Sequence, residues 1–229
     1  MIGIFNYTVW LTYLSFLSAS MGIIITFSFG KPLYGVLFLL FSGLCDAFDG
    51  KVASTKKDRT SFDKKYGIQI DSLSDVVAFG VLPAAIGVEI FNTSEFFQKI
   101  KVAGGVKEVV AFILVSVSIM MYMLAAKIRL AYFNVTEDER QQVEEGARAH
   151  YKGLPVTSAA LVFPVIFFLQ KQAETAFIII YFAVMVLMSF LFLLNFKVKK
   201  PGFKGVVWLT VVGLIEFLLI LLFKFCFDL

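Results

Sequence analysis

Four aspartates in two short stretches of a strongly apolar sequence could bind a metal ion. Asp46 and Asp49 are three residues apart, and Asp71 and Asp75 are four residues apart. On a helix, both spacings place the paired side chains on one face. A short basic loop separates the two pairs, so the helix ends that carry them must be neighbours. We therefore expect all four carboxylates to converge on one point.

Converging carboxylates favour a bound divalent cation. Like charges repel in an apolar setting and lose hydration, and neither stretch contains Lys or Arg that would neutralise them. Ligands that are all oxygen suit a hard cation, so we expect Mg²⁺ or Mn²⁺, with Ca²⁺ as a further candidate, rather than zinc. Four carboxylates suffice for two ions about 3.5–4 Å apart, the arrangement used in phosphoryl chemistry.

A purely structural explanation competes with metal binding for some of these residues. Asp71 and Asp75 are predicted to open a helix, where acidic side chains cap the backbone or complement the helix dipole. Asp46 and Asp49 are predicted to close one, where the dipole opposes anions. Capping therefore accounts poorly for the four together. Gly50 is compatible either with close approach of a ligand or with a helix C-cap.

The elements that must position these carboxylates are membrane-spanning helices. Of the 229 residues, 59% are hydrophobic, and the mean hydropathy is +0.84, which exceeds what a soluble domain of this size can bury. Long apolar blocks between charged clusters are typical of a helical bundle and not of a β-barrel. We predict an all-α transmembrane bundle, a single domain over residues 1–229 without a cleavable signal peptide. Seven spans are expected, at about residues 7–29, 32–49, 70–91, 106–132, 154–169, 176–196 and 206–225.

The distribution of cations predicts the orientation of the bundle. If the loop after the second span is cytoplasmic, 15 of the 21 Lys and Arg residues lie on the cytoplasmic side, as the positive-inside rule requires. We therefore expect an integral protein of the cytoplasmic membrane whose amino terminus and aspartates face the cytoplasm, at the ends of spans two and three. The charged segment 137–148 is expected to be a solvated or interfacial helix.

Residues 46–75 resemble the signature of the CDP-alcohol phosphatidyltransferase family. That signature reads D-x-x-D-G-x-x-A-R, then a spacer, then G-x-x-x-D-x-x-x-D. The four aspartates match it, together with Gly50, Ala53 and Gly67. One position departs, because Ser54 stands where the family usually has Arg.

The missing Arg leaves one expected contact open. In the family, that residue is expected to help hold the nucleotide phosphates. The candidates to replace it in this sequence are Lys56, Lys57 and Arg59.

Three further stretches are similar to the phosphatidylserine synthase branch of this family. They are residues 66–84, 128–134 and 151–155. In the second stretch, Tyr132 stands where the branch usually has a second Arg. The resemblance covers about the first 170 residues.

The resemblance implies a reaction and a set of roles. The phosphatidyl group of CDP-diacylglycerol would pass to the hydroxyl of L-serine, giving phosphatidylserine and CMP. Asp46, Asp49 and Asp71 would ligate metal, and Asp75 would ligate and also act as the base. The implied partners are the two substrates, the lipid bilayer and a second copy in a homodimer, with no nucleic acid. Candidate donor-binding residues are Thr12, Gly50, Ala53, Lys56, Lys57 and Gly67.

Other polar residues are predicted at the same cytoplasmic end and could hold serine. They are Arg129, Asn134, Tyr151 and Lys152. A guanidinium group suits a bidentate grip on the serine carboxylate. The alternative for Arg129 and Lys152 is a positive-inside anchor, and the alternative for Thr12 is helix packing.

Other functions stay open at this point. A sibling enzyme could use glycerol 3-phosphate or inositol phosphate, although such dianionic acceptors should need a denser basic pocket. An archaeal ether-lipid donor is equally compatible. A cation channel or transporter is the alternative outside enzymes, but transporters usually bind their ions near the membrane midplane and not at helix ends.

Overall fold

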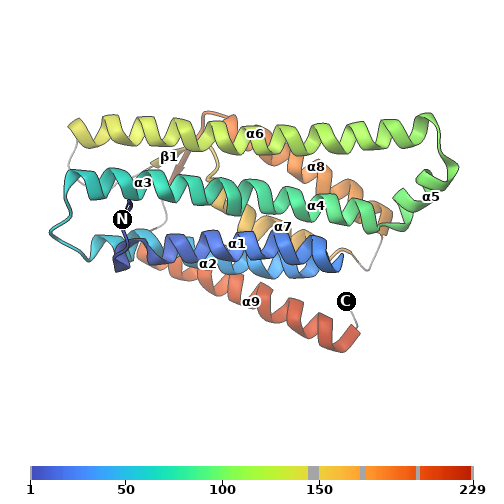
Figure 1. The fold of residues 1–229 in the computed structure, drawn as a ribbon, viewed down its shortest axis with the longest axis horizontal. Coiled ribbons are helices and arrows are strands. Elements are labelled where there is room, and N and C mark those ends of the chain that lie inside the picture. Colours follow the sequence, from blue (N-terminus) through green and yellow to red (C-terminus); the bar gives the residue numbers. More distant parts are fainter. Residues whose placement is uncertain (1, 144–149, 171–173, 200–201, 228–229) are drawn as a thin grey trace.

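The protein is an elongated bundle of helices that lie roughly side by side (Figure 1). The computed structural model describes residues 2–143, 150–170, 174–199 and 202–227. The helices are α1 (Trp10–Phe29), α2 (Pro32–Ser54), α3 (Ser61–Asp75), α4 (Leu82–Thr93), α5 (Glu95–Ala103), α6 (Val106–Val143), α7 (Ala159–Phe167), α8 (Glu174–Leu193) and α9 (Phe203–Phe227). Short 3-10 helices cover Tyr7–Val9 and Val156–Ser158, and a π-helical segment covers Val76–Val81. Two short strands, β1 (His150–Lys152) and β2 (Lys197–Lys199), pair antiparallel.

The all-α membrane fold predicted from the sequence is confirmed. Six helices in the described residues are long and apolar enough to cross a membrane, so the protein is an integral membrane protein. The predicted fifth span is a shorter apolar helix over residues 156–167, about 18 Å long at 1.5 Å per residue. Its buried residues include Ala159 and Phe163, so neighbouring helices cover it. The total of seven spans stays a prediction.

The third helix starts earlier than predicted. Thr60 and Asp63 form a capping box, in which each side chain accepts a hydrogen bond from the other residue's backbone N–H. From that cap, α3, the π-helical segment and α4 continue as one rod to Thr93. Asp71 and Asp75 therefore lie well inside a helix, and the prediction that they open it is wrong. Helix capping cannot explain them.

The second helix ends later than predicted. It runs beyond Asp49 to Ser54, and its C-cap is Thr55. Gly50 therefore lies inside α2, so the C-cap alternative for this glycine is wrong.

Small and hydroxylated residues bring α1 and α2 close together. Ser15 and Ser42 each donate to the other's backbone carbonyl, over 3.2 and 3.1 Å. One turn further along, Ser18 donates to the carbonyl of Phe38. Such contacts fix helix pairs in a membrane, where the hydrophobic effect supplies little attraction between helices. They set the position of α1 beside the end of α2 that carries Asp46 and Asp49.

Helix α6 runs antiparallel to the α3–α4 rod, and polar contacts fix the register between them. The hydroxyl of Tyr122 donates to the carbonyl of Phe79 inside the π-helical segment. Nearer the start of α3, Ser72 donates to the side chain of Asn134 over 2.7 Å, and Lys65 pairs with Asp138 at 3.5 Å.

Candidate active site

Three of the predicted aspartates meet at one end of the bundle. Carboxylate oxygens of Asp46 and Asp49 in α2 and of Asp71 in α3 all lie within 4.8 Å of one another. The side chain of Asp49 is buried, and the other two are partly buried. The convergence predicted from helix periodicity is therefore present in the structure.

The fourth aspartate touches this group from one side. Asp75 is buried at 7% exposure, and its carboxyl group lies within hydrogen-bonding range of Asp46. The hydroxyl of Thr12 in α1 donates to Asp49 Oδ2 over 2.9 Å. Thr12, a candidate for donor binding, thus orients a member of the group. We refer to Asp46, Asp49, Asp71 and Asp75 as the aspartate cluster.

The donor set of the aspartate cluster fits a divalent cation. None of the ion pairs between described side chains involves these four carboxylates. The nearest cation in the sequence, Lys51, has a buried ammonium group that lies 4.0 Å from the ring centre of Phe203 in α9. Four carboxylates of like sign repel strongly at low dielectric. Oxygen ligands without a protein counter-charge are those that Mg²⁺ and Mn²⁺ prefer.

The π-helical segment begins directly after the cluster. Asp75 is the last residue of α3, and Val76–Val81 follow in π-helical geometry. Single-turn π segments are rare and are frequent at functional sites. Tyr122 holds this one by donating to the Phe79 carbonyl. The segment was not predicted, and nothing in its residue types signals it.

The loop between α2 and α3 is closed by Arg59. Its guanidinium group donates to the carbonyls of Ala53, over 3.5 Å, and Asp63, over 3.2 Å. A Cβ atom added at Gly67 would lie 2.8 Å from Arg59 Nη2. The Arg59 guanidinium group therefore lies between Ala53, in the first half of the signature, and Gly67, in the second half.

The remaining donor candidates lie on the surface of the same region. Gly50 has no atom within 4 Å of the place where a Cβ would stand, so its backbone can be approached closely. Lys57 is exposed and Lys56 is half-buried, in the turn that follows α2. The hydroxyl of Ser54, at the position of the missing Arg, donates to the carbonyl of Lys51.

The residues predicted to bind the substrate serine lie in different surroundings. Arg129 is buried at 6% exposure, and its Nε lies 3.5 Å from the place where a Cβ on Gly153 would stand. Asn134 joins α6 to α3 through Ser72 and lines a surface cavity between the two helices.

The other two candidates belong to strand β1. Lys152 is exposed, and its ammonium group donates to the hydroxyl of Tyr132 over 3.1 Å. The backbone of Tyr151 pairs with Val198 in β2, whereas its side chain lies outside the described residues.

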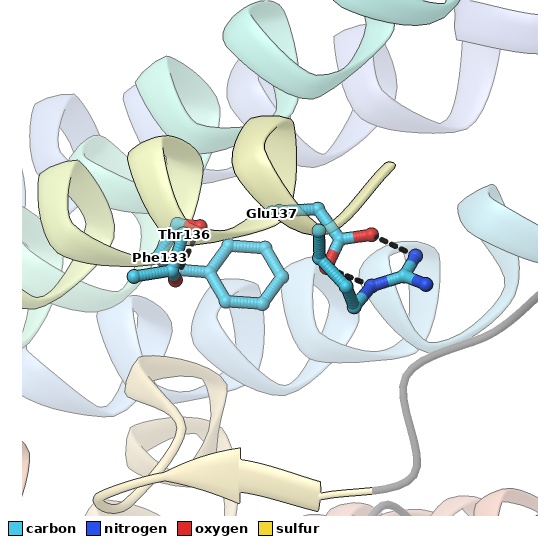
Figure 2. A network of polar contacts seen from close by, with 4 residues as sticks. Phe133, Thr136 and Glu137 are labelled. Atoms are coloured by element: carbon cyan, nitrogen blue, oxygen red, sulfur yellow. Dashed lines mark hydrogen bonds and ion pairs between the residues drawn. The ribbon is translucent and has the colours of Figure 1, made fainter. Parts of the chain in front are cut away.

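A buried ion pair near the end of α6 was not predicted. Arg140 donates through Nε and Nη2 to the two oxygens of Glu137, over 3.1 and 2.6 Å (Figure 2). Both side chains are largely buried, at 14% and 11% exposure. The expectation of a solvated segment from residue 137 onward is wrong for these two residues. The three-residue spacing is the only sequence signal, and it is common on exposed helices.

The fold and the aspartate cluster define an integral membrane protein with a carboxylate site suited to divalent metal. Residues 5–191 match the CDP-alcohol phosphatidyltransferase family. The chain therefore belongs to that family, and the resemblance seen in its signature is confirmed.

The curated relatives carry a more specific name. Two proteins from strains of Helicobacter pylori, each named CDP-diacylglycerol–serine O-phosphatidyltransferase, are 29% and 30% identical over 187 residues. That match covers 79% of this chain and 64% of each relative. A protein of the same name from Saccharomyces cerevisiae is 32% identical over 147 residues, which are 62% of this chain and 45% of the relative. The chain thus spans less than two thirds of the length of each of these relatives.

Proposed function

We propose that this protein transfers the phosphatidyl group of CDP-diacylglycerol to L-serine, giving phosphatidylserine and CMP. The observation that carries the proposal is the convergence of Asp46, Asp49 and Asp71 beside Asp75 in a matched family signature. The names of the curated relatives support serine as the acceptor. The position of the cluster at one end of its helices argues against a transporter, whose ion sites usually lie at the midplane.

The aspartate cluster would hold one or two divalent ions, Mg²⁺ or Mn²⁺. Asp46, Asp49 and Asp71 are the primary ligands in this proposal, with Asp75 as a further one. A bound ion would neutralise the pyrophosphate of the donor and stabilise charge on the departing CMP.

Asp75 would act as the base. Its carboxylate takes the proton of the serine hydroxyl while the serine oxygen bonds to the phosphorus that bears diacylglycerol. The bond between that phosphorus and the oxygen of CMP breaks, and CMP leaves with the electron pair.

Arg59 would supply the positive charge that Ser54 does not. Its guanidinium group already lies between Ala53 and Gly67, the two signature positions expected at the donor. Backbone carbonyls accept from both of its terminal nitrogens, which fixes the group in place. Lys56 and Lys57 are then secondary contacts for the phosphates.

The orientation belongs to the same proposal. We place the aspartate cluster at the cytoplasmic face of the cell membrane, since 15 of the 21 Lys and Arg residues are then cytoplasmic, as the positive-inside rule requires. The protein is expected to act as a homodimer. Crosslinking in intact membranes tests the dimer, and cysteine labelling from each side tests the orientation.

The acceptor is tested with purified protein, CDP-diacylglycerol and Mg²⁺ or Mn²⁺. Release of CMP should require L-serine, and the lipid product should be phosphatidylserine. Equal release with inositol phosphate or glycerol 3-phosphate would exclude the serine assignment. No release with any acceptor, from protein shown to be folded, would exclude the transferase activity itself.

A further inference from the structure

Helix α6 has an interior side that carries two buried charged side chains, Arg129 and Glu137. Resting on the proposed function, we infer that Glu137 binds the ammonium group of the acceptor and thereby makes the enzyme selective for a zwitterionic amino alcohol.

The contact between Ser72 and Asn134 defines where α3 and α6 face each other. At about 100° per residue, Asp71 and Asp75 are rotated by roughly 60–100° from Ser72. Phe133 and Glu137 are rotated by the same amount, in the same sense, from Asn134. Because the two helices are antiparallel, equal rotations point to the same side of the contact.

Burial agrees with this assignment of faces. Asp75, Arg129 and Glu137 are buried at 6–8% exposure. In contrast, Gln69 in α3 and Val135 in α6 are exposed. The aspartate cluster and the interior side of α6 therefore lie on the same side of the contact between α3 and α6.

The axial register sets the two groups at matching depth. Since Ser72 is level with Asn134, Asp75 is level with about residue 131 and Asp71 with about residue 135. Along the helix axis, Arg129 then lies roughly 3 Å beyond the level of Asp75, and Glu137 lies roughly 3 Å beyond the level of Asp71. Packed helix axes are about 8–10 Å apart, so one small molecule can contact the cluster and α6 together.

The charges presented by α6 match a zwitterion. Arg129 and Glu137 are two helical turns apart on the interior side, with Phe133 between them. The Glu137 carboxylate is held in a bidentate pair by Arg140, which fixes its orientation. L-Serine would place its carboxylate on Arg129 and its ammonium on Glu137, which turns its hydroxyl toward Asp75. An acceptor without an ammonium group would lack this contact with Glu137.

The test compares acceptors in Glu137→Gln, which keeps the shape of the side chain and removes its charge. Loss of one charge-assisted contact should raise the KM for L-serine roughly tenfold to hundredfold, with little change in kcat. Catalytic efficiency with 3-hydroxypropionate, which lacks the ammonium group, should change less than threefold. The KM for CDP-diacylglycerol should not change.

The matched control is Asp138→Asn. Asp138 is the next residue along α6, lies on the side that faces α3 and pairs with Lys65. It should behave as wild type with both acceptors. An equal loss for L-serine and 3-hydroxypropionate in Glu137→Gln would show a structural role and overturn the inference. An unchanged KM for L-serine would overturn it too. If wild-type protein makes no phosphatidylserine, the proposed function fails before this comparison begins.

Discussion

Two polar regions at the same end of the bundle are built on opposite electrostatic principles. The aspartate cluster brings four carboxylates together, and none of them forms an ion pair with a cationic side chain of the described residues. The interior side of α6 pairs its buried carboxylate with a guanidinium group over two hydrogen bonds. Like charges without a partner repel, whereas a bidentate pair largely offsets its own desolvation. The first region therefore needs a ligand to be stable, and the second does not.

This difference predicts how each region responds to loss of a charge. The largest effect is expected for Asp75→Asn, which should lower turnover by about 10²–10⁴-fold, the usual contribution of a general base. The variant should fold, because the amide reduces repulsion within the cluster. CMP release and thermal unfolding in detergent measure the two quantities. Retained turnover would remove Asp75 as the base.

The next effect concerns the hydroxyl that supports the cluster. Thr12→Val keeps the shape of the side chain and removes the hydrogen bond to Asp49. Loss of such a supporting contact typically weakens metal binding about tenfold to hundredfold, so activity should require more Mn²⁺. Ser20→Ala removes a hydroxyl that donates within the same helix to the Phe16 carbonyl and should leave the Mn²⁺ dependence unchanged. Identical Mn²⁺ titrations for both variants would contradict the role of Thr12.

A smaller effect is expected in the loop between α2 and α3. Gly67→Ala would place Cβ 2.8 Å from Arg59 Nη2 and displace the guanidinium. The KM for CDP-diacylglycerol should rise roughly fivefold, on the order of 1 kcal/mol. Arg59→Ala should raise it at least as much, and the double variant should show no further loss. Additive losses would mean that Gly67 acts independently of Arg59.

The smallest effect lies where α9 meets the signature. Phe203→Leu removes the ring that covers Lys51 and should destabilise the protein by about 0.5–1 kcal/mol. Trp208→Leu, at an exposed ring of the same helix, should change stability by less than about 0.5 kcal/mol. Thermal unfolding in one detergent compares the two. A larger loss for Trp208→Leu would exclude the contact as a stabilising one.

The two regions also differ in how far the sequence predicts them. The aspartate cluster was predicted because its spacings are local and the loop between the pairs is short, so helix periodicity and the short connection bring Asp46, Asp49 and Asp71 together. The early start of α3 had a readable signal, the capping pair Thr60 and Asp63, whose residues lie in a charged stretch that reads as a loop.

Other features depend on contacts between distant segments. The burial of Glu137 follows from the register of α6 against α3, which no local pattern encodes. The π-helical geometry of Val76–Val81 is accompanied by a hydrogen bond from another helix, in which the Tyr122 hydroxyl donates to the Phe79 carbonyl. The cover over α7 also comes from distant segments, such as α2, where Gly43 closely approaches Ala160.

The contact between Lys51 and Phe203 joins an ammonium group inside the family signature to a helix outside the stretch that matches the family, which ends at residue 191. Sequence comparison thus marks a shorter unit than the one that folds. A fragment trimmed to the matched stretch would remove the Phe203 ring from that ammonium group, which lies next to Gly50 in the sequence. Shortened versions of the protein intended for reconstitution should therefore retain α9 in full.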